Sequence, residues 1–366
     1  MDKRIHEHAR ILVDWSARIE QGDNVVVSVG EGAHELAVAV AEQVGRVGAN
    51  LLTTYSSDEI LRTYLEAHDG SFGTGPGPER AMFEAADVFL RLSAPQNTSE
   101  LGAIPGPATS GYSRARQATN TARMATDWVS TIHPTRALAQ HADMAFGAYR
   151  NFVYNAICFD WSTLATEMAK LQRLLDAGSE VVIEKDDHKL HLDIENRLSV
   201  NSAASVAYDS HNLPSGEVFT APAGATGEIT FDVPMTINGR QVRDVHLIVE
   251  NGVVVDHHAS RNQSVITDVL ETDAGSRRFG ELGFGMNRNI DRVTNNILFD
   301  EKMGDTVHLA LGRPYAACFP DRTPDFDSAI HIDLIADLST DSQVVIDGDV
   351  IQRNGRFRWE DGFSDK

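Results

Sequence analysis

The first half of the chain alternates between helical and extended patterns of apolar residues. Residues 5–21 and 33–47 carry apolar side chains at helical spacing. Runs at 24–30, 51–57 and 87–92 predict strands, and the first has the continuous β-branched character of a buried parallel strand. Strand–helix alternation of this kind predicts a layered α/β sheet with right-handed crossovers.

The pattern changes after an amphipathic helix predicted over residues 160–175. Short alternating runs then follow, separated by polar turns: EVVIEKDD, KLHLDIEN, GEITFDVP, VHLIVENGVVVDHH and TVHLALG. The Asn-Gly pair at 251–252 is a hairpin signal. We therefore expect an α/β protein with two domains, an N-terminal layered α/β domain over residues 1–177 and a β-rich α+β domain over residues 178–366.

The charge balance is strongly acidic. The net charge is -21, with 53 Asp and Glu residues against 32 Lys and Arg residues, and six of the basic residues are Lys. A self-repelling acidic surface is tolerated best where salt screens it, which is typical of halophilic proteins. An ordinary acidic cytosolic protein is the alternative. Both interpretations exclude nucleic-acid binding through a basic face, because phosphate affinity requires clustered Lys and Arg.

Segment composition and cysteine content indicate a cytoplasmic protein. No segment is long and apolar enough to span a membrane, and the start of the chain lacks the apolar block of a signal peptide. The two cysteines, Cys158 and Cys318, are too few for a disulfide framework, which favours a reducing compartment.

Several groups that can bind a divalent metal lie in the stretch from Asp305 to Leu334. His308 sits in an alternating apolar run, Tyr315 follows seven residues later, and a His331-x-Asp333 pair closes the stretch. On a strand, residues two apart point to the same face, so the pair is compatible with one metal centre. The imidazole, phenol and carboxylate groups suit divalent transition metals.

Three glutamates add to this set. Glu217 and Glu281 each follow a glycine and sit among small or apolar residues, and Glu301 lies just upstream of His308. A carboxylate buried in such surroundings is unfavourable unless it meets a cation or hydrogen-bond donors.

Four separate motifs resemble the aminopeptidase T/aminopeptidase S family of metallopeptidases, M29. They are GEVFTAP, GELG-x-G-x-N, DEK-x-G-x-T-x-HLALG-x-x-Y and SAIH-x-D. The resemblance covers nearly the whole chain. It implies a C-terminal catalytic domain, a homodimer, and two divalent metal ions (Co, Zn or Mn) that act on short peptides with a free N-terminus.

The resemblance also implies the metal ligands. Matching the motifs residue by residue gives Glu217, Glu281, His308, Tyr315, His331 and Asp333. The sequence departs from the family pattern at Asp305, where glycine is expected.

This ligand set suits hydrolysis of a peptide bond. Metal coordination lowers the pKa of water toward neutrality and so generates a nucleophile. A general base must carry the proton to the leaving amine, and Glu281 and Glu301 are the candidates. Tyr315 either ligates a metal or stabilises the oxyanion.

Two other functions are compatible with parts of the pattern. His308, His331 and Asp333 form a two-histidine, one-carboxylate set, as in mononuclear non-haem Fe(II) dioxygenases that open dihydroxypyridine rings. Such a site needs neither Glu217 nor Glu281, so their presence favours the peptidase. The remaining alternative is a catalytically silent dimer that binds metal or peptide.

Overall fold

The computed structural model describes residues 2–237 and 239–364, and the chain forms two compact units. Unit 1 extends to Phe159 and also includes Ala204–Pro214. Unit 2 comprises Asp160–Ala203 and the chain from Ser215 onward. The chain therefore passes from unit 1 to unit 2, returns for a short segment, and then completes unit 2.

Helix α9 (Trp161–Ala177) confirms the amphipathic helix predicted over residues 160–175. The Asp160 carboxylate caps its first turn. The helix contacts strands β7 (Val200–Ser202) and β9 (Glu217–Thr220), and it therefore belongs to unit 2. The domain boundary predicted between residues 177 and 178 would instead group α9 with the first unit.

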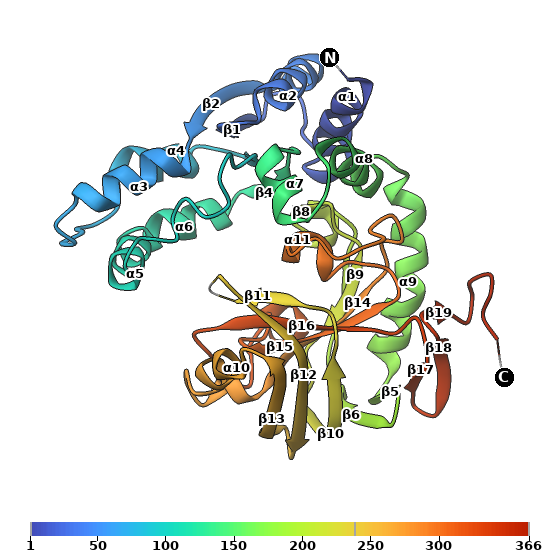
Figure 1. Ribbon diagram of the computed structural model, residues 1–366. Coiled ribbons are helices and arrows are strands. Elements are labelled where there is room, and N and C mark those ends of the chain that lie inside the picture. The colour runs from blue at the N-terminus through green and yellow to red at the C-terminus, as the bar shows by residue number, and fades with distance from the viewer. Residues whose placement is uncertain (1, 238, 365–366) are drawn as a thin grey trace. The chain divides into compact units, whose positions relative to one another are not determined.

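Unit 1 is a layered α/β structure around a parallel sheet of strand order β2-β1-β3-β4-β8 (Figure 1). Its strands are β1 (Asn24–Gly30), β2 (Asn50–Ser56), β3 (Val88–Ser93), β4 (Asp127–Ile132) and β8 (Asn212–Leu213). Its helices are α1 (Lys3–Arg10), α2 (His34–Val47), α3 (Asp58–Ala67), α4 (Gly77–Glu84), α5 (Gly106–Ala115), α6 (Gln117–Met124), α7 (Arg136–His141) and α8 (Phe146–Ile157). The three predicted strands are confirmed to within one residue at each end.

The predicted helices of this unit are confirmed with one correction. Helix α2 matches the prediction over residues 33–47. The helix predicted over 5–21 is wrong at its C-terminal end, because α1 continues only as a π-helical turn over Ile11–Ser16. Arg18 then adopts a left-handed backbone with φ of 52°, which ends the helix.

Unit 2 contains two largely antiparallel sheets, which confirms a β-rich α+β structure. One sheet has the order β16-β15-β14-β9-β7, and the other has the order β11-β12-β10-β6-β5-β17-β18-β19, with β13 paired to β12. The remaining strands are β5 (Glu180–Lys185), β6 (His188–Asp193), β10 (Gly224–Phe231), β11 (Met235–Ile237), β12 (Arg240–Glu250), β13 (Val253–Arg261), β14 (Phe279–Gly285), β15 (Thr306–Gly312), β16 (His331–Asp337), β17 (Ser342–Ile346), β18 (Asp349–Arg353) and β19 (Arg356–Phe357). Two further helices are α10 (Gln263–Leu270) and α11 (Ile297–Asp300).

Two turns in unit 2 show how local sequence sets the backbone. Asn251 and Gly252 connect β12 to β13 with φ of 50° and 77°, which confirms the predicted hairpin. Asp305 has φ of 67° immediately before β15. This left-handed conformation explains why glycine is expected there, and Asp is one of the few other residues that tolerate it.

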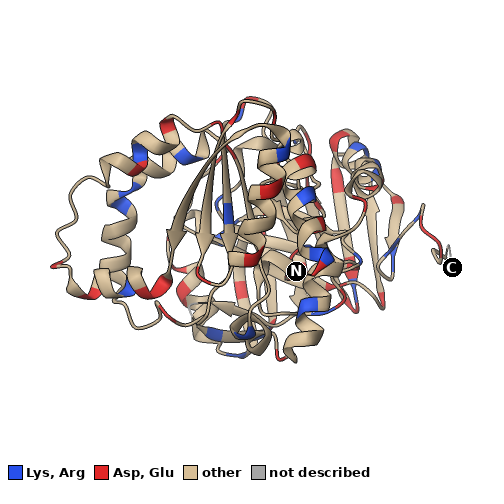
Figure 2. Ribbon diagram, turned by 90° about the horizontal axis from the view of Figure 1, so that it is seen from above, with Lys and Arg blue, Asp and Glu red and all other residues tan. Residues whose placement is uncertain are grey.

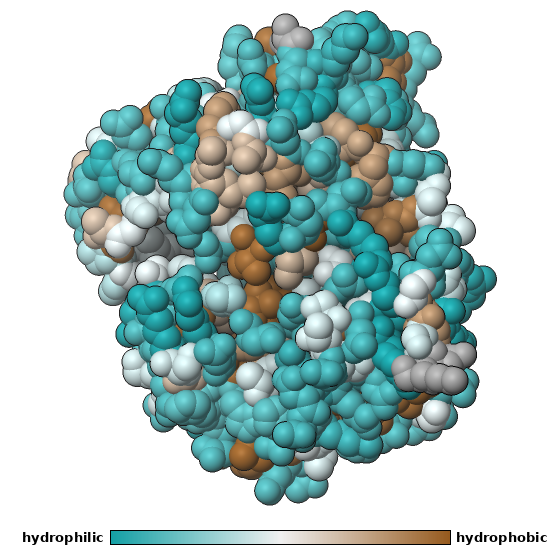
Figure 3. Space-filling model, turned by 45° about the vertical axis from the view of Figure 1, so that its right-hand side comes forward, coloured by the Kyte–Doolittle hydropathy of each residue, from teal (hydrophilic) through white to brown (hydrophobic). Residues whose placement is uncertain are grey.

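The surface is predominantly polar. Figure 2 shows Asp and Glu residues spread over many helices and loops, in keeping with the net charge of -21. The face drawn in Figure 3 is largely hydrophilic, with separate hydrophobic patches. Within the described residues, no helix combines the length and hydropathy needed to cross a membrane.

Candidate metal centre

The candidate site lies on one face of the sheet formed by β16, β15, β14, β9 and β7 in unit 2. Cross-strand pairing aligns Glu281 with Ala310, and Ala310 with Asp333. The next row aligns Gly283 with His308. Because paired residues on neighbouring strands point to the same face, the register brings these side chains together.

Glycine and alanine provide the space that the larger groups occupy. Strands β14 and β15 are buried along their entire length. A Cβ atom on Gly283 would lie 2.1 Å from Nε2 of His308, so the imidazole lies directly over this glycine. On the face of β14 that carries Glu281, the next two positions are thus glycines, Gly283 and Gly285, which have no side chain.

Glu281 connects the two imidazoles. Its Oε1 lies 3.1 Å from Nε2 of His308, and its Oε2 lies 3.3 Å from Nε2 of His331. His308 Nε2 is also 3.6 Å from Oε2 of Glu217, while His331 Nε2 is 3.4 Å from Oδ1 of Asp333. The result is two adjacent groups with Glu281 in common.

Each group has the size of a metal site. One comprises Glu217, Glu281 and His308, and the other comprises Glu281, His331 and Asp333. Within each group, one potential ligand atom per residue lies within 4.8 Å of the others. The structure therefore brings together five of the six residues predicted as ligands.

Tyr315, the sixth residue, borders the cluster. It precedes a short 3-10 turn at Ala316–Cys318. Its ring packs edge-on against His331 with centroids 4.9 Å apart, and it also contacts Phe219. Nearly half of its surface, 48%, is exposed. The ring thus lies close to the second group, and part of the residue is exposed to solvent.

The cluster concentrates carboxylates in a buried environment. Burial raises the pKa of Glu217. Burial opposes ionisation of Glu281 as well, but contacts with His308 and His331 outweigh it and lower the pKa of Glu281. Burial would lower the pKa of His331, whereas Asp333 and Glu281 raise it to about 11. The carboxylates of the cluster therefore stabilise positively charged groups that lie between them.

The polar atoms fit bound cations. Nδ1–H of His331 donates to the carbonyl of Arg313 at 2.8 Å, so in the neutral ring the Nε2 lone pair faces the carboxylates of Glu281 and Asp333. Opposed lone pairs repel unless a proton or a metal ion lies between them. Among the described residues, the buried Oε2 of Glu217 and Nδ1 of His308 have no hydrogen-bond partner. Imidazole and carboxylate donors in this arrangement suit Zn, Co or Mn.

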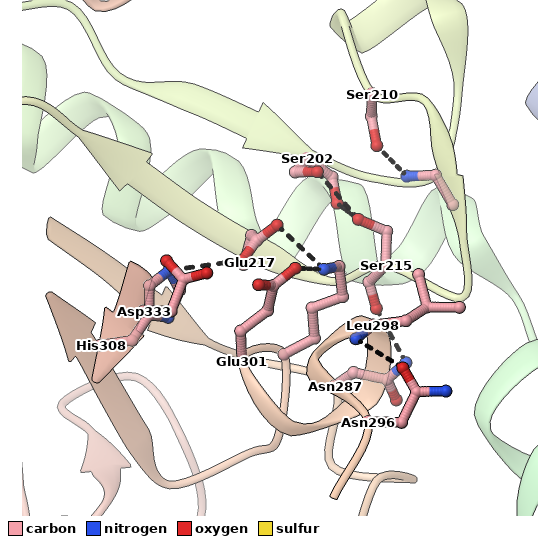
Figure 4. Close-up of polar contacts among 12 residues, drawn as sticks. Ser202, Ser210, Ser215, Glu217, Asn287, Asn296, Leu298, Glu301, His308 and Asp333 are labelled. Carbon is pink, nitrogen blue, oxygen red and sulfur yellow. Dashed lines mark hydrogen bonds and ion pairs between the residues drawn. The ribbon is translucent and has the colours of Figure 1, made fainter. Parts of the chain in front are cut away.

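A buried lysine was absent from the predicted set. Lys302 has no exposed side-chain surface, and its Nζ lies 3.5 Å from Oε1 of Glu217 and closer still to Glu301. Figure 4 labels Glu217 and Glu301, and a dashed line from each carboxylate marks its ion pair with this ammonium group. Glu301, a predicted general base, therefore reaches the cluster through Lys302 and is in neither ligand group. The sequence contains one signal for this residue: the chain has only six lysines, and Lys302 directly follows Glu301 in the DEK motif.

Comparison with known proteins agrees with the resemblance seen in the motifs. The family model described as "Thermophilic metalloprotease (M29)" matches residues 1–357. Aminopeptidase 2 of Geobacillus stearothermophilus is 26% identical over 98% of each chain. Aminopeptidase T of Thermus aquaticus is 26% identical over 86% of this chain and 85% of its own.

A solved structure shows the same fold. Wild-type AmpT from Thermus thermophilus superposes with a TM-score of 0.85 and 21% identity, covering 97% of this chain and 99% of its own. The relatives named here are aminopeptidases, which does not favour the dioxygenase alternative. Because the family model matches almost the entire sequence, the chain belongs to the M29 family of thermophilic metalloproteases.

Proposed function

We propose that this chain is an aminopeptidase that removes N-terminal residues from short peptides at a centre with two divalent ions. The ligands would be Glu217, Glu281, His308, Tyr315, His331 and Asp333. The observation that carries the proposal is the position of Glu281, whose two oxygens each face a different imidazole. A carboxylate so placed is suited to bridge two ions.

The family and its relatives support the reaction class. The matching family is described as metalloproteases, and the related proteins are named aminopeptidases. When bound, divalent ions at this site would supply Lewis acidity, which lowers the pKa of water and polarises a carbonyl oxygen. Three carboxylates against two divalent ions would leave the centre with a net positive charge.

The roles of the two candidate bases differ. Both oxygens of Glu281 are engaged by histidines, which suits a ligand better than a proton carrier. Glu301 is partly accessible and is held by the ammonium of Lys302. We therefore assign proton transfer to Glu301: it accepts the proton that the attacking water loses and delivers it to the leaving amine. Tyr315 would serve either as a ligand or as a hydrogen-bond donor to the oxyanion.

The expected homodimer and cytoplasmic location rest on the family resemblance and the composition, and they stay predictions. Activity is testable directly. The protein supplied with Co, Zn or Mn in high salt is expected to release N-terminal residues from short peptides. N-acetylated copies of the same peptides are the matched control and should remain intact. Equal cleavage of acetylated peptides, or no release with any of the three metals, would contradict the proposal.

A further inference from the structure

A second cluster of metal-capable side chains lies on the other sheet of unit 2. His188 is on β6, Glu228 on β10 and His246 on β12, three strands that are neighbours in the order β12-β10-β6. All three side chains are half-buried, and one ligand atom of each lies within 4.8 Å of the others. None of these residues belongs to the candidate centre around Glu281.

We propose that His188, Glu228 and His246 bind a divalent transition-metal ion of the Zn²⁺ class. The proposal is independent of the peptidase assignment, because it rests on a different sheet and on different residues.

The strand register brings the three groups together. Thr230 on β10 pairs with His246 on β12, so these two side chains share a face. Glu228 lies two residues before Thr230 on the same strand and therefore on the same face. Pairing of β10 with β6 ends at Gly227, where φ is 123° and a Cβ would lie 2.2 Å from the Lys189 carbonyl oxygen. Only glycine fits this close approach of the two strands.

Thr230 orients both imidazoles. Its Oγ1 lies 3.0 Å from Nδ1 of His246 and 3.3 Å from Nδ1 of His188. A hydroxyl oxygen has two lone pairs and can accept from both Nδ1–H groups. In that state each neutral ring carries its lone pair on Nε2. Fixing the tautomer through the second ring nitrogen is how proteins prepare histidines to bind metals.

The distances suit a small ion. Nε2 of His246 lies 3.2 Å from Oε2 of Glu228. A tetrahedral site with ligand bonds of about 2.0–2.1 Å has edges of about 3.3 Å, so this pair is already at the required separation. The two imidazole rings have centroids 4.7 Å apart, and one ring nitrogen of His188 lies within 4.8 Å of the ligand atoms of Glu228 and His246. Two histidines and one glutamate leave a fourth position for water.

Zinc binding to the full-length chain tests the proposal. Equilibrium dialysis against Zn²⁺ followed by elemental analysis should give one ion per chain fewer for His246→Ala than for wild type. The Thr230→Val variant, which keeps the shape but lacks the hydroxyl, should weaken binding at this site by about 10- to 100-fold in a calorimetric titration. His191→Ala is the matched control, because His191 is on β6 but pairs with Glu180 outside the cluster.

The difference in ion count between wild type and His246→Ala tests the second site, however many ions the Glu281 centre binds. Failure of that centre would lower the ion count of wild type and His246→Ala equally and leave the difference at one. Equal ion counts and equal affinities in wild type and His246→Ala would overturn the second site. If His246→Ala does not fold, as judged by circular dichroism, Glu228→Gln gives the same comparison with a side chain of nearly unchanged shape. Unchanged zinc binding by Glu228→Gln would likewise refute the site.

Discussion

Substitution of Gly283 by alanine should disable the centre while leaving the protein folded. The added Cβ would lie 2.1 Å from Nε2 and 2.2 Å from Cε1 of His308, whereas ordinary contacts begin at 3.4 Å. The imidazole must therefore move by about 1.3 Å. A displacement of about 1 Å in a catalytic group can lower the rate by about 100-fold, which corresponds to about 2.7 kcal/mol.

The structural penalty of this change should be smaller than its effect on activity. The obstacle is the end of one side chain, so the expected loss of folding free energy is that of moderate overpacking, about 1–3 kcal/mol. We expect kcat/KM on a short peptide to fall by about 100-fold or more, with reduced metal content and a cooperative urea transition.

Gly224→Ala is the matched control. Gly224 lies in β10 of the same unit, and a Cβ there would meet Cβ of Asp193 at 3.9 Å, an ordinary contact. This variant should retain wild-type activity. If Gly283→Ala retains wild-type kcat/KM and metal content, the position of His308 over Gly283 has no role in the site.

Three further predictions concern the buried charges. Glu281→Gln should lose both metal and activity, whereas Glu301→Gln should keep its metal and lose about 10²–10⁴ in kcat; a fully active Glu301→Gln would exclude it as the base. Lys302→Met should lower the free energy of unfolding of the metal-free protein by about 3–5 kcal/mol in urea titrations, because it leaves Glu217 and Glu301 without their cation, and an unchanged value would show that the lysine is dispensable. Asp300 is buried, which raises its pKa to about 6 from 3.8 although Thr294 donates to it. The folded state therefore holds this proton more tightly, so the contribution of Asp300 to stability declines by about 3 kcal/mol as pH rises from about 4 to 6. Asp300→Asn should remove that decline in urea titrations across this range, and parallel pH profiles for the two proteins would contradict it.

The sequence was most informative where local pattern decides local structure. The continuous apolar run of β1, the amphipathic pattern of α2 and the Asn251-Gly252 turn each depend on neighbours along the chain, and all three were predicted. The end of the first helix was not, because its apolar spacing continues beyond Ser16 while the backbone of Arg18 turns left-handed. Periodicity of side chains does not report such a backbone change.

The geometry of the site could not be predicted from the sequence, because it depends on which residues face one another across the sheet. The motifs indicated which residues belong together, but spacing along the chain cannot show that His308 lies over Gly283 or that Glu281 faces two imidazoles. Lys302 was missed for the same reason, since its burial depends on Glu217, far away in sequence. The alternation of β16 did correctly predict that His331 and Asp333 share a face, because a strand fixes the relation of residues two apart.

The metal content of the His246→Ala protein is the decisive measurement for a two-ion centre around Glu281. This variant lacks the proposed site on β6, β10 and β12, so its count reports on the centre around Glu281 in isolation. After separate dialysis against Zn²⁺, Co²⁺, Mn²⁺ or Fe²⁺, we expect two ions of Zn, Co or Mn per chain. One ion per chain, with iron bound in preference to the other metals, would contradict a shared carboxylate between two ions and would favour a mononuclear site at His308, His331 and Asp333.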